Sequence, residues 1–258
     1  MIISFYKYQG TGNDFIIIDD RDNAIELTKA LIVKLTNRKF GIGGDGVILI
    51  RDHAKLDFEM IFYNPDGTQS FCGNGSRCAV LFAFHMGMVA KQVNFLSTDG
   101  IHKAIVISDS LVEVDMIGNI KVDNLGDGAA FSNTGSPHYV QYKNNVDDLD
   151  FIDLARTIRY SDAYKLEGVN VNFIHSQDDG LFVRTYERGV EAETLSCGTG
   201  VTAAALVHAL KLKLTTGKIK VFTKGGELSV GFDYDGNVFN NVTLKGAATY
   251  VFKGEIDG

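Results

Sequence analysis

Two cysteines of this chain stand in the same short pattern, Cys-Gly-x-Gly, once in FCGNGSRC from Phe71 to Cys78 and once in SCGTGVTA from Ser196 to Ala203. A glycine directly after the cysteine lets the backbone approach a ligand closely. In both copies a segment typical of a helix follows, and a helix start offers free N–H groups and a positive dipole end. That end binds anions and lowers the pKa of a cysteine placed there. Each copy therefore predicts an activated thiol beside a cradle for a carboxylate.

A pair of such thiols, Cys72 and Cys197, suits one class of reaction. Inverting an sp³ carbon by proton transfer needs a base on one face of the carbon and an acid on the other. Two thiols on opposite sides of one anionic ligand would supply both, and the helix starts would stabilise the carbanion. A thiol redox pair is a possible alternative, although the usual Cys-x-x-Cys spacing is missing. No Cys or His pair has the spacing of zinc ligands, so we expect no metal site.

The cysteine pattern belongs to a longer repeat. The segments TGNDFII and TGSPHYV begin at Thr11 and Thr134, 123 residues apart, and YNPDG and YERGV keep the same offset. Cys72 and Cys197 are 125 residues apart, which an insertion of two residues explains. Several short matches in one register are hard to attribute to chance. The chain is therefore predicted to consist of two homologous halves that meet near residues 118–124.

Each half shows the same order of elements. An opening strand, at 2–8 or 139–142, leads to a helix, and two strands follow whose alternation is typical of sheets. The Cys-Gly-x-Gly turn then leads to the long apolar helix, and two or three strands with turns such as Asp99-Gly100 complete the half. This order predicts an α+β fold, duplicated, with mostly strands and one central helix in each half.

The repeat also predicts the domain limits. We expect an N-terminal domain over residues 1–118, which carries Cys72, and a C-terminal domain over 119–246, which carries Cys197. The last strand pattern, at residues 247–256, has no partner in the first half. We expect it to cross back and complete the sheet of the N-terminal domain.

Composition narrows the class of protein. The chain has 258 residues, 45% of them apolar, and a net charge of −7, which argues against nucleic acid as a partner. No apolar run is long enough for a membrane span, and we expect no membrane association. Three cysteines, an odd number, form no disulfide framework, so a reducing cytoplasm is the expected compartment. Cys78 has no counterpart, because Ala203 stands 125 residues later, and we interpret it as a packing residue.

Eight segments resemble the diaminopimelate epimerase family, in chain order GTGNDF, GIGGDG, YNPDG, CGNG, GSPH, VNVNF, YERG and CGTG. Together they cover nearly the whole chain. The resemblance implies an enzyme that interconverts LL- and meso-2,6-diaminopimelate in lysine and peptidoglycan synthesis, without pyridoxal phosphate or a metal. It also implies two pseudo-symmetric domains, each a strand barrel around a central helix, and a homodimer.

The resemblance assigns roles to individual residues. Cys72 and Cys197 match the catalytic thiols, and His138 and Glu187 match the positions that tune them. The residues that match the groups holding the reacting carboxylate are Gly73, Asn74, Gly198 and Thr199. The residues that match contacts to the rest of the substrate are Asn13, Asn64, Asn170, Glu187 and Arg188. Two positions depart from the family pattern: Gly46 stands where a glutamine is frequent, and Ser136 where an asparagine is usual.

Other interpretations remain open for these residues and for the protein. Asn13 and Asn64 are typical turn residues, and Glu187 with Arg188 is compatible with a surface charge pair. For the whole protein the alternatives are a proline or hydroxyproline racemase, a phenazine-type isomerase, and a binding protein that kept the fold without catalysis. The intact cysteine pair argues against the last two, and YERG beside CGTG favours a diamino diacid over proline.

Overall fold

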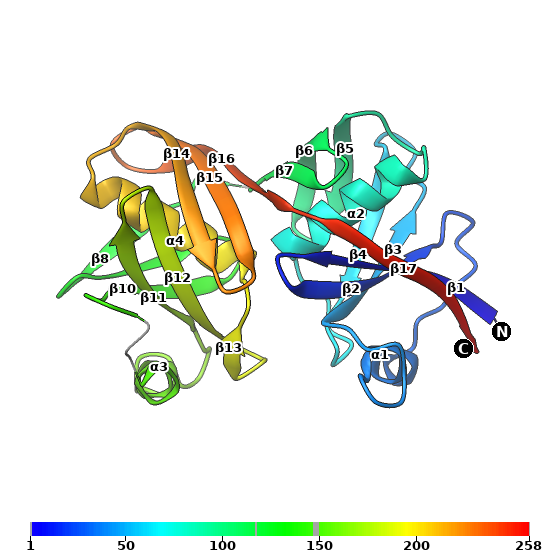
Figure 1. Cartoon of the computed structure of the whole chain (residues 1–258), viewed down its shortest axis with the longest axis horizontal. Coiled ribbons are helices and arrows are strands. Elements are labelled where there is room, and N and C mark those ends of the chain that lie inside the picture. Colours follow the sequence, from blue (N-terminus) through cyan, green and yellow to red (C-terminus); the bar gives the residue numbers. More distant parts are fainter. Residues whose placement is uncertain (1, 117, 147–149, 258) are drawn as a thin grey trace. The chain divides into compact units, whose positions relative to one another are not determined.

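Strands make up most of the regular secondary structure, as the short alternating apolar segments predict. The computed structural model describes residues 2–116, 118–146 and 150–257. It divides the chain into two compact units (Figure 1). Unit 1 comprises Met1–Asp115 together with Gly246–Gly258, and unit 2 comprises Met116–Lys245. The chain thus passes from unit 1 to unit 2 and returns to unit 1 near its C-terminus.

Unit 1 is a run of strands around one helix. Its elements are β1 (Ile2–Gly10), β2 (Asn13–Asp19), α1 (Lys29–Thr36), β3 (Gly46–Arg51), β4 (Phe58–Tyr63), α2 (Gly73–His85), β5 (Gln92–Ser97), β6 (Gly100–Ser108), β7 (Leu111–Asp115) and β17 (Thr249–Asp257). Strand β17 pairs antiparallel with β1, from Ile2 opposite Asp257 to Gln9 opposite Thr249. The first strand of the chain therefore lies between β2 and β17.

Unit 2 repeats this order. Its elements are β8 (Val122–Gly126), β9 (Ala129–Asn133), β10 (Pro137–Tyr142), α3 (Phe151–Arg159), β11 (Asn170–Gln177), β12 (Gly180–Glu187), β13 (Ala192–Thr194), α4 (Gly198–Lys211), β14 (Thr216–Thr223) and β15 (Gly226–Tyr234). Strand β16 (Phe239–Ala247) follows and runs from unit 2 into the start of the returning segment. Strand β8 pairs with β9 much as β17 pairs with β1.

The pairing pattern corrects one detail of the predicted repeat. The strand expected to open the second half, at 139–142, is preceded by β9, and these two strands pair antiparallel. Strand β10 then pairs parallel with β11, as β2 pairs parallel with β3. Strand β10 is therefore the counterpart of β2, and β9 is the counterpart of β1. The polar residues of β9 hid its strand character in the sequence.

Helices α2 and α4 are the central helices. Both are buried along nearly their whole length and are mostly apolar, as helices in protein interiors usually are. Helix α2 contacts β1, β2, β3, β4, β6, β7 and β17, and α4 contacts β8, β9, β10, β11, β12, β14 and β15. The predicted α+β class, with one central helix in each half, is confirmed. Both helices begin three residues earlier than the apolar pattern indicated, at Gly73 and Gly198.

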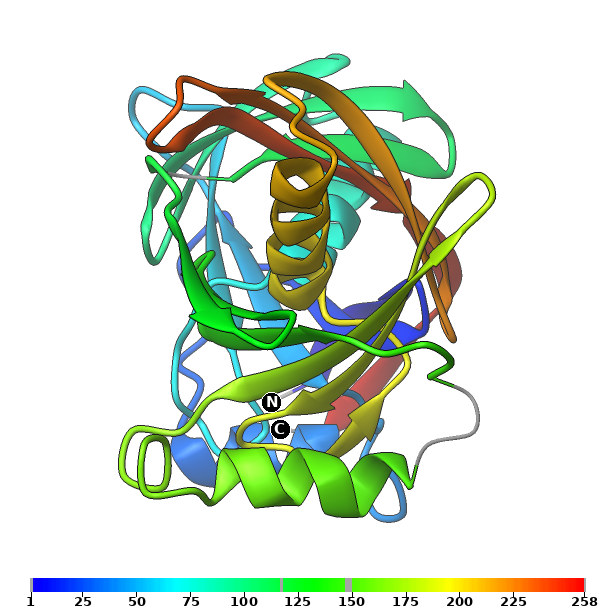
Figure 2. The ribbon, with the colours of Figure 1, turned by 90° about the vertical axis from the view of Figure 1, so that its left-hand side faces the viewer.

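Helices α1 and α3 lie outside the strands of their own units. Helix α1 buries Ile32 and Leu35, while α3 buries Phe151 and Ala155. Figure 2 shows α3 below the strands of unit 2 and α4 among them. Both outer helices thus present one apolar stripe to a sheet, as the spacing of their apolar residues predicts.

Candidate active site

Cys72 is the N-cap residue of α2. Its backbone is extended, with φ −137° and ψ 107°, and the Gly75 N–H donates to its sulfur at 3.4 Å. The cysteine side chain thus takes the place that serine or aspartate usually occupies at a helix start. Because the free N–H groups of the first turn surround the sulfur, a negative charge there is stabilised.

Asn13 approaches this thiol from the hairpin between β1 and β2. The two turn residues, Thr11 and Gly12, both have positive φ, at 51° and 84°, as a type I′ turn requires. Asn13 Oδ1 accepts from Asn74 Nδ2 at 3.2 Å and lies 3.9 Å from Cys72 Sγ. The structure therefore brings Asn13, Cys72 and Asn74 together at the start of α2.

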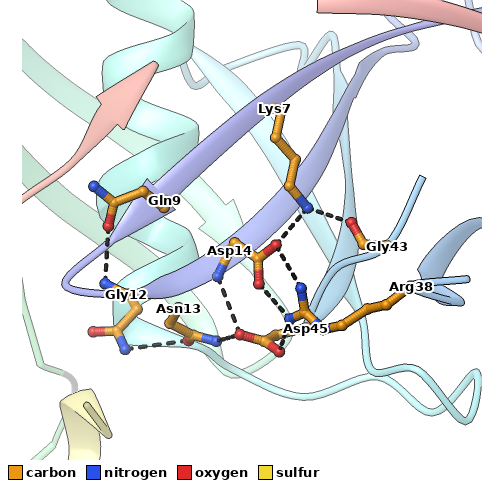
Figure 3. Close-up of polar contacts among 9 residues, drawn as sticks. Lys7, Gln9, Gly12, Asn13, Asp14, Arg38, Gly43 and Asp45 are labelled. Carbon is orange, nitrogen blue, oxygen red and sulfur yellow. Dashed lines mark hydrogen bonds and ion pairs between the residues drawn. The ribbon is translucent and has the colours of Figure 1, made fainter. Parts of the chain in front are cut away.

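Asp45 holds the other end of the Asn13 amide (Figure 3). Asn13 Nδ2 donates to Asp45 Oδ2 at 2.6 Å, and the Asp14 N–H donates to the same oxygen at 3.1 Å. A carboxylate accepts but cannot donate, so Asn13 must direct its nitrogen to Asp45 and its oxygen toward Cys72. Asp45 thereby determines that the oxygen of the amide, and not its nitrogen, faces the thiol.

Two cations surround these carboxylates. Lys7 is buried, pairs with Asp14 at 2.6 Å and donates to the Gly43 carbonyl, while Arg38 bonds Asp14 at 2.5 Å and Asp45 at 2.7 Å. Burial would raise the pKa of Asp14, but the hydrogen bonds from Arg38 and Lys7 outweigh it and lower that pKa. The Asp14 carboxylate therefore stays ionised, and it pairs with both Lys7 and Arg38 next to Asn13 (Figure 3).

Cys197 occupies the same position at the start of α4. It is the N-cap residue, with φ −118° and ψ 111°, and it is buried. Its sulfur lies 3.5 Å from Thr199 Oγ1, and Thr199 Oγ1 lies 2.9 Å from His138 Nε2. The predicted residues Cys197, Thr199 and His138 thus form one chain of contacts within unit 2.

The neighbours of His138 determine its tautomer. Asn172 Nδ2 donates to the Tyr139 carbonyl at 2.9 Å and faces His138 Nδ1 at 3.1 Å, while Thr185 Oγ1 donates to Asn172 Oδ1 at 2.9 Å. Since Nδ1 accepts, Nε2 carries the hydrogen and donates to Thr199. Burial, with the nearby Arg188 cation, lowers the pKa of His138 to about 3, so the ring is neutral near pH 7.

Two of the residues predicted to contact the rest of the substrate, Asn170 and Arg188, also meet, together with Ser136. Asn170 Nδ2 donates to Ser136 Oγ at 2.9 Å, and Asn170 Oδ1 accepts from the Arg188 N–H at 2.8 Å. Arg188 also directs Nη2 to Ser136 Oγ at 3.4 Å, and its side chain is exposed. Glu187 precedes it, half-buried at the end of β12. Ser136 therefore joins Asn170 and Arg188 through its hydroxyl.

Asn64 and Gly46 have local structural roles. Asn64 Nδ2 donates to Thr68 Oγ1 and Ser70 Oγ, both at 3.1 Å, and so closes its own turn. A Cβ atom at Gly46 would lie 2.2 Å from Phe62 Cε2. The Phe62 ring fills the space that a longer side chain at position 46 would need.

Sequence reasoning missed three residues of these networks: Asp45, Arg77 and Asn172. Asp45 stands in GIGGDG and Asn172 in VNVNF, two of the segments that carry the family resemblance, so position alone pointed to them. Arg77 lies inside the apolar helix α2 and is fully buried. A charged residue amid an apolar helical pattern was the available signal.

The described residues form neither a cluster of metal ligands nor a membrane-spanning helix. In the ranges 2–116, 118–146 and 150–257, no three His, Cys, Asp or Glu side chains gather as metal ligands would. Within the same ranges, no helix combines the length and apolarity needed to cross a bilayer.

Comparison with known proteins identifies relatives along nearly the whole chain. A model of the family described as diaminopimelate epimerase matches residues 5–122 and 130–251. A protein named diaminopimelate epimerase from Flavobacterium psychrophilum is 44% identical over 254 residues, which cover 97% of this chain and 99% of that one.

Two solved structures share the fold. A phenazine biosynthesis protein of the PhzF family from Bacillus anthracis has a TM-score of 0.79 at 12% identity, with 99% of each chain covered. A probable proline racemase from Agrobacterium radiobacter K84 has a TM-score of 0.74 at 14% identity, with 99% of this chain and 93% of that chain covered.

Proposed function

Because the chain belongs to the diaminopimelate epimerase family, we propose that it interconverts LL- and meso-2,6-diaminopimelate with Cys72 and Cys197 as the two proton-transfer groups. Epimerases are isomerases, so membership of this family identifies the chain as an isomerase. The observation that carries the mechanism is the equivalent position of the two thiols, each the N-cap residue of a buried central helix.

The proposed reaction moves one proton off the α-carbon and another onto it. The thiolate of one cysteine takes the α-hydrogen as a proton, and the electron pair stays on carbon and the adjacent carboxylate. The thiol of the other cysteine then gives its proton to the opposite face. The substrate gains and loses nothing but its configuration, and the two cysteines exchange protonation states. No pyridoxal phosphate or metal is needed for this balance.

The helix starts would stabilise the charge that develops. The reacting carboxylate would accept from backbone N–H groups of the first turns, at Gly73, Asn74, Gly198 and Thr199. Donors fixed in advance by the fold need no rearrangement when the charge forms. The neutral His138 would act on Cys197 through Thr199, whose hydroxyl lies 2.9 Å from Nε2 and 3.5 Å from the sulfur.

The far end of the substrate would be held by polar groups without a reactive thiol. Arg188 is suited to a carboxylate through paired N–H groups, and Ser136 and Asn170 orient it. Asn13, Asn64 and Glu187 complete the proposed contacts. Asn64 would contribute mainly its Oδ1, because its Nδ2 closes the local turn. We further propose a cytoplasmic homodimer that supplies lysine and peptidoglycan precursors.

The test combines isotope exchange with three cysteine variants. The reduced protein is incubated with LL-diaminopimelate in D₂O, and deuterium at the α-carbon is read in product and recovered substrate. Two bases predict meso product that carries deuterium while substrate recovered early carries little, since the deuteron is delivered to the opposite face. Cys72→Ala and Cys197→Ala should each lose at least about a thousandfold in turnover.

Cys78→Ala is the matched control, because Cys78 is buried within α2 and burial raises the pKa of its thiol. It should retain turnover within about threefold of the parent chain. Equal early labelling of substrate and product, or turnover retained in either of the other two variants, would exclude the two-thiol mechanism.

A further inference from the structure

Arg77 is a buried cation that the proposed reaction does not yet use. It lies in α2, five residues after Cys72, and its side chain has no exposed surface. Burial lowers the pKa of its guanidinium to about 10, so it keeps its charge at neutral pH. A buried charge is costly unless an opposite charge or hydrogen bonds compensate it.

The hydrogen-bond partners of Arg77 are neutral. Nη1 donates to the Gly73 carbonyl at 3.3 Å, Nη2 to Thr11 Oγ1 at 3.3 Å, and Nε to the Ala247 carbonyl at 3.4 Å. All three bonds are long, and among the described residues no carboxylate forms an ion pair with Arg77. The charge thus has no fixed anion next to it.

Arg77 also connects the first turn of α2 to the hairpin that carries Asn13. Thr11 has φ 51°, a conformation that is unfavourable for a β-branched residue, and the bond from Arg77 supports it there. Gly10 leaves room for this contact, since a Cβ atom there would lie 3.3 Å from Arg77 Nη2. One side chain therefore touches both elements that meet at the Cys72 sulfur.

The Arg77 guanidinium binds the carbonyl of Gly73, the residue next to Cys72. It interacts electrostatically with the sulfurs of Cys72 and Cys78. Burial raises the pKa of the Cys78 thiol despite the nearby Arg77, so Cys78 remains protonated. Cys72 is less buried and stands at the helix start, where a thiolate is favoured. The Asn13 oxygen, 3.9 Å from the sulfur, is an acceptor and disfavours this thiolate, so a nearby positive charge is needed to hold it. Cys72 is the anion that the buried cation can compensate.

The second half lacks this charge. Thr202 stands 125 residues after Arg77, and its Oγ1 donates to the Gly198 carbonyl at 3.0 Å. A neutral hydroxyl thus makes the bond that the guanidinium makes to the Gly73 carbonyl in α2. The two thiols stand in equivalent backbone positions but in different fields.

We propose that Arg77 is a positioning residue for the reaction, whose buried charge holds Cys72 as the thiolate in the resting enzyme while Cys197 keeps its proton. The proposal rests on the proposed function of the two cysteines. It gives the enzyme one base and one acid before substrate arrives, although the backbone around the two sulfurs is duplicated.

The other titratable groups around α2 include residues that are paired with other side chains or are neutral. From β1, Lys7 is paired with Asp14 of β2. Also from β1, Tyr8 interacts with Cys78, and burial raises its pKa, so it is neutral. From β6, His102 is held between two carboxylates and stacks on Phe71 at 4.5 Å between ring centroids. Other titratable side chains on these elements include Tyr6 of β1, His85 at the end of α2 and Tyr250 of β17.

The experiment measures thiolate formation without substrate. The reduced full-length protein is alkylated with iodoacetamide from about pH 5 to about pH 10, and peptide mass spectrometry reads Cys72 and Cys197 separately. The variants are Arg77→Met and Arg77→Gln, which remove the charge, and Arg77→Lys, which keeps it. Thr202→Val is the matched control at the equivalent position of α4. Circular dichroism verifies the fold of each variant. If one of the two neutral variants does not fold, the other still tests the proposal.

In the parent chain, Cys72 should react at lower pH than Cys197. Loss of the charge should move the Cys72 midpoint up by at least about one pH unit and leave the Cys197 midpoint unchanged. Arg77→Lys should keep the Cys72 midpoint close to that of the parent chain, and Thr202→Val should leave the Cys72 midpoint unchanged. An unchanged Cys72 midpoint in a folded neutral variant, or an equal shift of both cysteines, overturns the proposal.

The same measurement separates this proposal from the proposed function. Alkylation requires no diaminopimelate, so the charge effect on Cys72 is visible even in a protein that does not turn that substrate over. A shifted Cys72 midpoint without epimerase activity would reject the function and keep the role of Arg77. Normal epimerase activity with an unshifted midpoint would do the reverse.

Discussion

Asn13 shows how much of a site depends on the neighbour of a ligand-facing residue. Its amide is oriented by Asp45, which takes the Nδ2 hydrogen at 2.6 Å and leaves Oδ1 for Asn74 and the Cys72 sulfur. Arg38 in turn holds Asp45 at 2.7 Å. The chain of contacts runs from an exposed arginine to the buried side of the thiol.

We predict that Asp45→Ala lowers kcat/KM for epimerisation by about ten- to a hundredfold, because Asn13 can then rotate and present the wrong group to its neighbours. The thermal midpoint should change little, since Asp45 is substantially exposed. Asp19→Ala is the matched control. Asp19 ends the same strand, β2, and its loss removes an ion pair to Arg21 without affecting the contacts of Asn13. Equal kcat/KM values for the two variants would contradict this role of Asp45.

At the scale of single residues, the sequence predicted the pattern better than the contacts. The duplicated Cys-Gly-x-Gly indicated both thiols at helix starts, and the structure has each as an N-cap residue. The amide of Asn64 closes its own turn, which is the alternative that its residue type had indicated. Asp45, Arg77 and Asn172 were missed because their roles arise from segments far apart in the sequence.

Each central helix must fit a glycine against its own surroundings. In α4, a Cβ at Gly200 would lie 2.5 Å from Asn172 Oδ1, an oxygen that Thr185 holds in place. In α2, a Cβ at the equivalent Gly75 would lie 3.3 Å from Ile48 Cδ1, the flexible end of a side chain. The same position of the repeat is therefore tight in one half and tolerant in the other.

We expect Gly200→Ala to lower the free energy of unfolding by about 1–3 kcal/mol, because Asn172 and the ring of His138 must move. Gly75→Ala should change it by less than about 1 kcal/mol, since better helix propensity offsets the closer contact. Urea denaturation of both variants beside the parent chain measures the difference. A Gly75 variant as unstable as the Gly200 variant would show that crowding at Asn172 is not the cause.

At the scale of elements, periodicity predicted the helices and most strands, but some limits were off and strands β2, β8, β9 and β13 were missed. The central helices begin at the glycines after each cysteine, which an apolar pattern cannot mark. Strand β9 was missed because its sequence, AAFSN, has small and polar residues that sheet pairing with β8 and β10 overrides. Such pairing is a tertiary effect that local pattern does not contain.

The free energy of unfolding of the whole chain should depend on pH through the buried residue His102. His102 lies between Asp99 at 3.0 Å and Asp115 at 3.2 Å. Burial would lower its pKa, but the bonds to Asp115 and Asp99 outweigh it and raise the pKa to about 9. The unfolded value is about 6.5, so folding favours the protonated ring. This stabilisation is complete below about pH 6.5 and is lost as pH rises through about 9.

We predict that His102→Gln lowers the free energy of unfolding by about 2 kcal/mol more at pH 6 than at pH 10. Urea denaturation at the two pH values measures this difference. His175→Gln is the control, because among the described residues the His175 ring has no carboxylate partner. A His102 effect of equal size at both pH values would mean that the ring contributes only packing.

Strand β17 has a consequence for how the protein is made. Its residues, Thr249–Asp257, follow all of unit 2 in the chain, yet they complete the sheet beside β1. On the ribosome, domains generally fold in order of synthesis, the N-terminal one first. Here the strands of unit 2 emerge before the last strand of unit 1, so one side of β1 stays unpaired during synthesis. An unpaired strand edge can pair with another chain, so the nascent protein must keep that edge covered until translation has passed residue 257.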